Sequence, residues 1–320
     1  MHLLQDAIKI MSMKYCLNLF LFCFFLNATS QEPNYTSQNI EINKLIDGTL
    51  LLPIATNQPK LAIIIADYGP TDRNGNQNFS NNNSLKKLAE SLTNNGIATF
   101  RYDKRIVKQI LKKKIDPNIT FDTFVTDAIS VVDYFKEANN YSGIYIIGHG
   151  QGSLVGMLAS KENADGFISL AGSGQSIDQV ITEQITTMDP SLANGTKKAF
   201  ESLKQGKLTK DYPPALETIF RADVQPFIMN WMQYNPQQAL KSLAIPTLII
   251  NGTKDLQVSV DEAKLLKAAS DNAEIKIIDN MNHVLFIIEG DQLENSKSYN
   301  ESFRTISEEL ITTVSSFILK

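Results

Sequence analysis

A glycine-framed turn at residues 148–152 carries the clearest chemical pattern in this sequence. An apolar run at 144–147 ends at Gly148, and small and apolar residues resume at helical spacing from Gly152. A strand, sharp turn and helix of this kind are typical of a nucleophile elbow, whose Gly-x-Ser-x-Gly pattern lifts a reactive serine above the carboxyl edge of a parallel sheet. Gly150 stands at the serine's position. The sequence therefore predicts the turn without its nucleophile.

The elements that would position this turn alternate between strand and helix patterns. Apolar strand patterns occupy 45–53, 61–66, 97–102 and 167–170, and helical spacing occupies 84–92 and 121–138. Strands joined by helices of this length require right-handed crossovers. We therefore expect an α/β fold with a mostly parallel central sheet and helices on both faces.

A change of pattern divides the chain after Gly172. Polar helical segments broken by prolines continue to about residue 243 without a strand candidate, which predicts an inserted helical cap. Strand patterns return at 245–250 and 274–278, with helical patterns at 260–269 and 302–318. The expected organisation is a core in two parts, 45–173 and 244–320, with the cap at 174–243.

The N-terminus has the pattern of a secretory signal. Lys14 precedes an apolar run at 15–26, and small residues follow up to Ser30. We expect a signal peptide at 1–30, a polar leader at 31–44, and a secreted or periplasmic protein with no stable membrane span after cleavage. A membrane anchor is the less favoured alternative, because the run is shorter than the roughly 20 residues that cross a bilayer.

Composition excludes several other kinds of chemistry. Both cysteines, Cys16 and Cys23, lie in the expected signal, so a mature chain would have no disulfide and no cysteine ligand or nucleophile. The net charge is −4, and no basic cluster combines with aromatic residues, which argues against a nucleic-acid partner. The histidines lack the spacing of metal ligands, so we expect no metal and no other cofactor.

Several short motifs, in order along the chain, resemble those of α/β-hydrolases of the serine aminopeptidase and carboxylesterase kind. They are DGTLLLP at 47–53, GPTDRNGN at 69–76, RYDKR at 101–105, GHGQGS at 148–153, NGTKDLQV at 251–258 and NH at 282–283. The resemblance covers nearly the whole chain after the expected signal. It implies the α/β-hydrolase fold and hydrolysis of ester or peptide bonds.

The same resemblance assigns two members of a catalytic triad, which in these enzymes occur in the order serine, acid, histidine. Asp255 follows a predicted strand and would accept the imidazole N–H. His283 follows the next strand and would act as general base. Gly150 accepts the strained conformation of the turn's apex but supplies no oxygen.

The expected oxyanion hole also departs from the family. One donor would be the N–H of Gln151, and the other would come from the loop after strand 61–66. Relatives usually carry small residues in that loop, whereas this chain has Asp67 and Tyr68. A carboxylate there would oppose a developing oxyanion, and a tyrosine would crowd the acyl pocket.

These departures favour a secreted α/β-hydrolase-like protein with lost or strongly reduced serine-hydrolase activity. Its pocket would bind a small acyl- or peptide-like ligand. The alternatives are an active hydrolase that uses Ser153 or an activated water, or an engineered or sequence change at Gly150 of an active serine enzyme. We expect Gly150→Ser to restore some labelling by a fluorophosphonate probe.

Overall fold

A computed structural model describes residues 34–161 and 163–320; the signal expected at 1–30, with Cys16 and Cys23, lies outside them. The described residues form an eight-stranded sheet of order β1-β2-β4-β3-β5-β6-β7-β8. The strands are β1 (Tyr35–Glu41), β2 (Asp47–Pro53), β3 (Leu61–Ile65), β4 (Ala98–Tyr102), β5 (Ile144–His149), β6 (Gly166–Leu170), β7 (Thr247–Gly252) and β8 (Ala273–Ile278). All pairs from β4 to β8 are parallel, and only β1–β2 and β2–β4 are antiparallel. The predicted mostly parallel sheet is confirmed.

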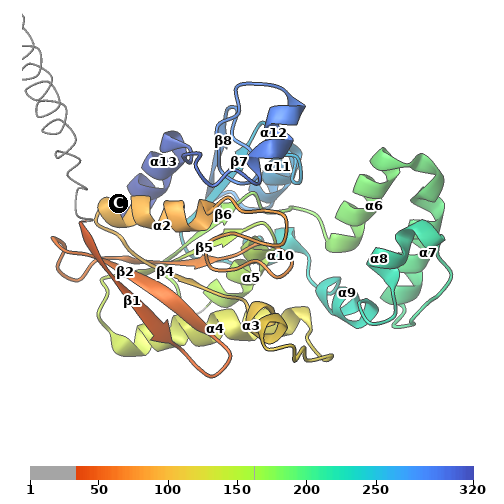
Figure 1. Cartoon of the computed structure of the whole chain (residues 1–320), viewed down its shortest axis with the longest axis horizontal. Helices are drawn as coiled ribbons and strands as arrows, with labels where there is room; N and C mark the ends of the chain where they lie inside the picture. Colours follow the sequence, from red (N-terminus) through yellow and green to blue (C-terminus); the bar gives the residue numbers. More distant parts are fainter. Residues whose placement is uncertain (1–33, 162) are drawn as a thin grey trace, which may run out of the picture. The chain divides into compact units, whose positions relative to one another are not determined.

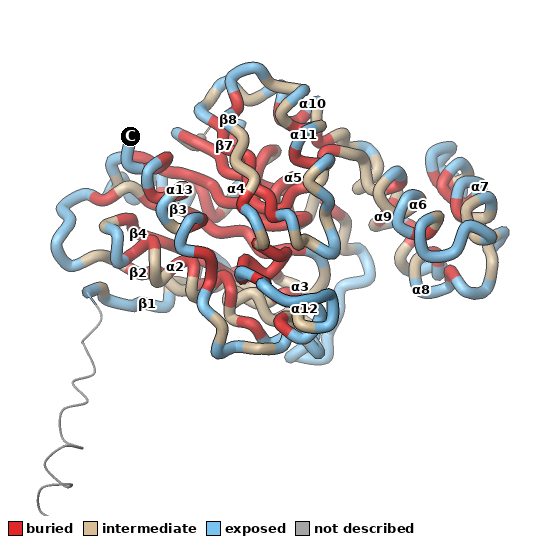
Figure 2. Tube along the Cα trace, turned by 90° about the horizontal axis from the view of Figure 1, so that it is seen from above, coloured by how far each residue is buried: buried red, intermediate tan, exposed pale blue. Residues whose placement is uncertain are grey.

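Helices cover both faces of this sheet, as the sequence predicts (Figure 1). On one face α2 (Ser84–Asn94) and α13 (Glu308–Leu319) pack on one core cluster. On the other face α4 (Phe121–Ala138), α5 (Gln151–Ser160), α10 (Pro236–Lys241) and α11 (Val260–Ala269) pack on a second cluster. Successive strand residues divide between the two, since Ile63 joins one cluster and Ile64 the other. Buried backbone accordingly runs through the centre of the sheet (Figure 2).

The cap contains its own small core. Helices α6 (Ile177–Met188), α7 (Ala193–Lys204), α8 (Glu217–Phe220) and α9 (Gln225–Trp231), with short 3₁₀ turns at Pro190–Leu192 and Pro214–Leu216, lie together in Figure 1. Apolar side chains such as Phe200, Leu203 and Phe220 form a cluster separate from the two clusters on the sheet. Ala239 and Leu240 of α10, within the expected cap range, join the core cluster instead.

The structure also contains elements that the sequence analysis did not predict. Strand β1 lies within the segment 31–44 expected to be a polar leader, and helices α3 (Arg105–Leu111) and α12 (Gln292–Ser298) were not expected. The final helix begins at Glu308 rather than near 302. Strand β1 is mostly exposed and pairs with β2 through its backbone, so it has no alternating apolar pattern to reveal it. No helix among the described residues is long and apolar enough to cross a membrane.

Three of the family-like motifs meet in one ion-pair network beside β4. Arg73, from the loop after β3, donates through Nε to Asp103 Oδ2 at 2.9 Å and also pairs with Asp47 of β2. Lys108 of α3 pairs with the other oxygen of Asp47 at 2.5 Å. The three charged motif residues, together with Lys108, therefore hold the loop after β3 against the sheet.

The elbow depends on close contact between β3 and α5. A Cβ atom added to Gly152 would lie 2.4 Å from the carbonyl oxygen of Ile65 and 2.7 Å from that of Ala66. Both contacts are with backbone atoms, which cannot move without shifting a central strand.

We expect Gly152→Ala to lower the free energy of unfolding by about 1–3 kcal/mol, the usual effect of overpacking a tight core. The matched control is Gly143→Ala, whose Cβ would have its nearest contact at 3.5 Å, on the Asp165 carboxylate. Urea unfolding of both variants measures the difference. Equal stability of the two variants would contradict this account of the elbow.

Candidate active site

The elbow forms as the sequence predicts, with β5 ending at His149, Gly150 at the apex and α5 beginning at Gln151. Gly150 has φ 53° and ψ −119°, a combination that side chains with a Cβ adopt only under strain. Its N–H donates to the carbonyl of Leu170 at 2.9 Å. The apex thus keeps its conformation without a side chain.

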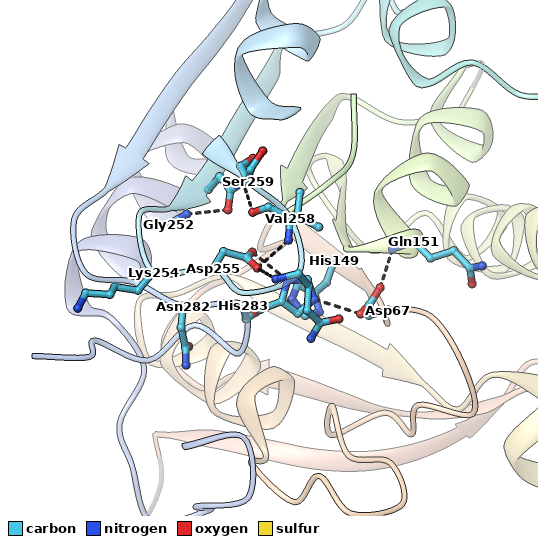
Figure 3. A network of polar contacts seen from close by, with 12 residues as sticks. Asp67, His149, Gln151, Gly252, Lys254, Asp255, Val258, Ser259, Asn282 and His283 are labelled. Atoms are coloured by element: carbon cyan, nitrogen blue, oxygen red, sulfur yellow. Dashed lines mark hydrogen bonds and ion pairs between the residues drawn. The ribbon is translucent and has the colours of Figure 1, made fainter. Parts of the chain in front are cut away.

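Asp67 occupies the space that a serine side chain would need. A Cβ atom added to Gly150 would lie 1.8 Å from Asp67 Oδ1 and 2.2 Å from its Cγ. The Asp67 carboxylate comes from the loop after β3 and accepts the N–H of Gln151 at Oδ1, at 2.7 Å. Gln151 N–H is the expected oxyanion donor, so the carboxylate takes both the nucleophile's space and one donor of the hole (Figure 3).

His283 lies between two carboxylates. It donates through Nδ1 to Asp255 Oδ2 at 2.9 Å and through Nε2 to Asp67 Oδ2 at 3.1 Å (Figure 3). Asp255 is held by the N–H groups of Gln257 and Val258, at 2.7 and 2.9 Å from its Oδ1. The structure therefore brings the sequence-predicted Asp255 and His283 together in the arrangement of a triad, with Asp67 in place of the serine.

These contacts set the protonation of the cluster. Burial alone would lower the pKa of His283, but the charges and hydrogen bonds of Asp255 and Asp67 outweigh it and raise the pKa to about 10. Burial opposes ionisation of Asp67 as well, yet the hydrogen bond from His283 and the positive charge of His283 hold the pKa of Asp67 well below the usual range. A histidine with carboxylates on both nitrogens is a double donor, so His283 is an imidazolium at neutral pH.

His149 packs against His283 and steadies the loop that carries it. Its Nε2–H donates to the carbonyl oxygen of His283 at 2.8 Å, and the ring centroids are 4.6 Å apart. Burial and the positive charge of His283 lower the pKa of His149, which keeps it neutral.

One grouping among the described residues has the composition of a metal site. Asp67, His149 and His283 place ligand atoms within 4.8 Å of one another, which their spacing along the chain did not indicate. Hydrogen bonds to protein atoms already engage His149 Nε2 and both nitrogens of His283. We therefore interpret these three residues as part of the buried ion-pair cluster rather than as metal ligands.

Lys104 is a buried residue of this site that the sequence analysis did not single out, although it lies in the RYDKR motif. Its Nζ donates to the backbone oxygen of Asp67 at 2.7 Å and to Gln151 Oε1 at 2.9 Å, and it lies 4.6 Å from the centre of the Phe124 ring. Burial lowers the pKa of Lys104 to about 8. Its place in the RYDKR motif was the signal that could have found it.

The other candidate side chains are engaged elsewhere. Ser153 is buried in α5, and its hydroxyl is 2.7 Å from that of Ser169 in β6. Ser173 donates to Glu262 at 2.8 Å. Tyr68 is half-exposed and stacks on Trp231 of the cap, with ring centroids 6.0 Å apart. Neither serine is bonded to His283.

A cavity of about 380 Å³ opens above the elbow, between the core and the cap. Its floor includes Asp67, Gly150, Gln151 and His283. Its walls are mainly apolar side chains of the cap, among them Ile181, Ile185, Val224, Phe227, Ile228 and Trp231. Both the volume and the apolar lining are within the range of small-molecule sites.

The elbow after β5, an acid after β7 and a histidine after β8 define an α/β-hydrolase. The family described as serine aminopeptidase, S33 matches residues 80–291. The chain belongs to this family, as the resemblance of its motifs indicates.

The chain is similar in sequence to a protein named as an esterase and in fold to several solved structures. It is 27% identical to esterase EstD of Thermotoga maritima over 283 residues, which cover 83% of this chain and 66% of that protein. Among solved structures, Est1E from Butyrivibrio proteoclasticus matches 89% of this chain and 99% of its own, with a TM-score of 0.56 at 18% identity. The Pyrococcus furiosus esterase PF2001 matches 90% of this chain and 91% of its own, with a TM-score of 0.53 at 14% identity. The two structural matches establish the fold.

We predict that Asp67→Asn lowers the pKa of His283, because it removes one of the two negative charges that raise it. Imidazole ¹⁵N NMR should show His283 of the unmodified protein titrating near pH 10, with neutral His149 as an internal reference. In the variant the midpoint should move down. An unchanged midpoint would mean that Asp67 is not in contact with the ring.

The same change should alter the pH dependence of stability. The pKa of His283 in the folded protein exceeds its ordinary value of about 6.5. The charged form of His283 therefore makes its full contribution to the free energy of unfolding below about pH 6.5. The contribution is lost as the pH rises toward 10. Urea unfolding should therefore show a smaller loss of stability between pH 6.5 and 10 in Asp67→Asn than in the unmodified protein.

Proposed function

We propose that this chain is a ligand-binding α/β-hydrolase without serine-hydrolase activity. The observation that carries the proposal is the position of the Asp67 carboxylate, 1.8 Å from where a Cβ at Gly150 would be. A substrate carbonyl would meet no nucleophile at the apex. It would also find the Gln151 N–H already bonded to Asp67.

Activation of a water molecule by His283 is disfavoured for a related reason. A general base must be unprotonated, but the two carboxylates keep His283 charged at neutral pH. Asp67, with its lowered pKa, is a weak base. The cluster therefore lacks a group that would accept a proton from water.

The cavity supports a binding role. Apolar walls from the cap and a polar floor are the usual features of a small-molecule site. The sequence pattern at 1–30 leads us to propose further that the protein acts outside the cytoplasm, as a secreted or periplasmic protein.

The second candidate function is catalysis by Asp67 itself. Its Oδ2 lies 3.1 Å from His283 Nε2, a distance suited to a nucleophile and its histidine, and carboxylates serve as nucleophiles in other enzymes. Such an attack on an alkyl halide would form an ester with Asp67 and release the halide. Mass spectrometry after incubation with an alkyl bromide would detect the added alkyl group, and its presence would contradict a purely binding role.

We predict that the unmodified protein neither hydrolyses short-chain p-nitrophenyl esters nor reacts with a fluorophosphonate probe. Gly150→Ser alone should also fail, because the new side chain would collide with Asp67. Gly150→Ser combined with Asp67→Ala should gain labelling and at least about tenfold in rate, since losing one triad member costs a serine hydrolase about 10⁴-fold or more in rate.

The controls separate this outcome from the alternatives. Asp67→Ala alone should stay unlabelled, and His283→Ala added to the double variant should abolish the gain. Labelling of the unmodified protein that disappears in Ser153→Ala would show an active serine hydrolase and contradict the proposal. Full activity of Gly150→Ser alone would mean that the glycine replaced an otherwise functional serine.

A further inference from the structure

At the floor of the cavity, the N–H groups that would donate hydrogen bonds to an ester substrate are already bonded to another group. In a serine esterase the N–H after the nucleophile is free to bind the negative oxygen of the substrate. Here Gln151 N–H donates to Asp67 Oδ1 at 2.7 Å, and His283 Nε2–H donates to Asp67 Oδ2 at 3.1 Å. Two donors that would face a carbonyl are occupied by the same carboxylate.

The carboxylate can still accept further hydrogen bonds. An ionised carboxyl group has about four lone-pair sites, and Asp67 uses one on each oxygen for these two bonds. Its side chain lines the cavity. The free capacity at the floor is therefore that of an acceptor with negative charge.

The polar groups around Asp67 do not change the floor from a hydrogen-bond acceptor into a donor. The Gln151 side chain extends away from the Asp67 carboxylate (Figure 3), and its Oε1 accepts from Lys104, which does not line the cavity. The buried Nε2 of Gln151 has no partner, but it lies at that distant end of the side chain. The hydroxyl of Ser173 is committed to Glu262.

The charged groups of the site leave the Asp67 carboxylate facing the cavity. Of the residues that line the cavity, Asp67 and His283 are charged at neutral pH. The positive charge of His283 is shared with Asp255, which lies behind it at 2.9 Å from Nδ1. Lys104, with a pKa of about 8, is also mostly protonated at neutral pH, so the two carboxylates, the imidazolium and the ammonium sum to zero. Lys104 donates to the backbone oxygen of Asp67 and to Gln151 and does not line the cavity, so the Asp67 carboxylate is the charged group there with unused hydrogen-bonding capacity.

We propose that the cavity binds an apolar chain ending in a hydrogen-bond donor, with a primary alkylammonium as the preferred head group. The head would donate to Asp67, and the chain would lie against the apolar cap residues such as Ile181, Phe227 and Trp231. A carboxylate head of the same chain length would be repelled by Asp67 and would find its potential donors occupied. This inference rests on the proposed binding function and assigns the class of ligand.

The test compares octylamine, octanol and octanoate at neutral pH, each below its aggregation limit. Trp231 is the single tryptophan of the chain and lines the cavity, so its fluorescence reports binding. We expect octylamine to bind most tightly and octanoate most weakly. Asp67→Asn should weaken octylamine about 10- to 100-fold, as expected from the loss of a charge-assisted hydrogen bond.

The control for charge is Asp223→Asn, which removes a carboxylate from the exposed surface of the cap outside the cavity and should leave octylamine affinity unchanged. Octanoate binding as tightly as octylamine to the unmodified protein would overturn the head-group inference while leaving a binding function in place. No binding of any of the three would overturn both. The comparison among ligands needs no variant, so it remains decisive if Asp67→Asn does not fold.

Discussion

The contact between the Asp67 carboxylate and the apex of the elbow determines the rest of this site. Asp67 can reach His283 and Gln151 N–H only because Gly150 has no side chain, and a side chain at 150 would have to displace the carboxylate. The two residues are therefore physically dependent on each other. This dependence explains why the missing serine and the unusual loop after β3 occur in one chain, although they are more than 80 residues apart in sequence.

Burying two carboxylates and an imidazolium is costly unless their hydrogen bonds are satisfied. The fold supplies the bonds to the two carboxylates from the loop after β7 and from the elbow, and His149 and Lys104 support the backbone beside them. Backbone N–H groups hold Asp255 and Asp67, His149 holds the backbone at His283, and Lys104 holds the backbone at Asp67. Removing one carboxylate would leave the histidine charge less compensated. The cluster is thus a structural unit as well as part of the floor of the cavity.

Much of the core could be predicted from the sequence because its signals are local. Apolar periodicity located α4 and α11 at their observed bounds, and the strand patterns gave the parallel sheet. Helical spacing also indicated the cap, but not that α10 packs with the core. The exposed strand β1 has no apolar alternation, so it could not be recognised before its pairing with β2 was known.

Sequence reasoning could name several residues of the candidate site, but it could not predict the contacts between them. Asp255 and His283 follow from motif order, and Asp67 stood out as a charge beside the expected oxyanion hole. Its bond to His283 joins residues 216 positions apart, and no local pattern encodes such a contact. Lys104 was missed because a lysine after a strand ordinarily faces solvent. The metal-like grouping of Asp67, His149 and His283 was missed for the same reason as the bond to His283.

The elbow shows why a motif of this kind indicates a fold more securely than an activity. Gly148 and Gly152 are required by backbone packing, because a Cβ at either would lie within 2.4 Å of a carbonyl oxygen. That requirement persists whether or not the apex is reactive. The apex side chain, by contrast, has no packing partner in the motif itself and is constrained only by what faces it from β3. Chemistry at an elbow should therefore be inferred from the apex and the opposing loop together, and in this chain the opposing loop supplies the carboxylate that fills the site.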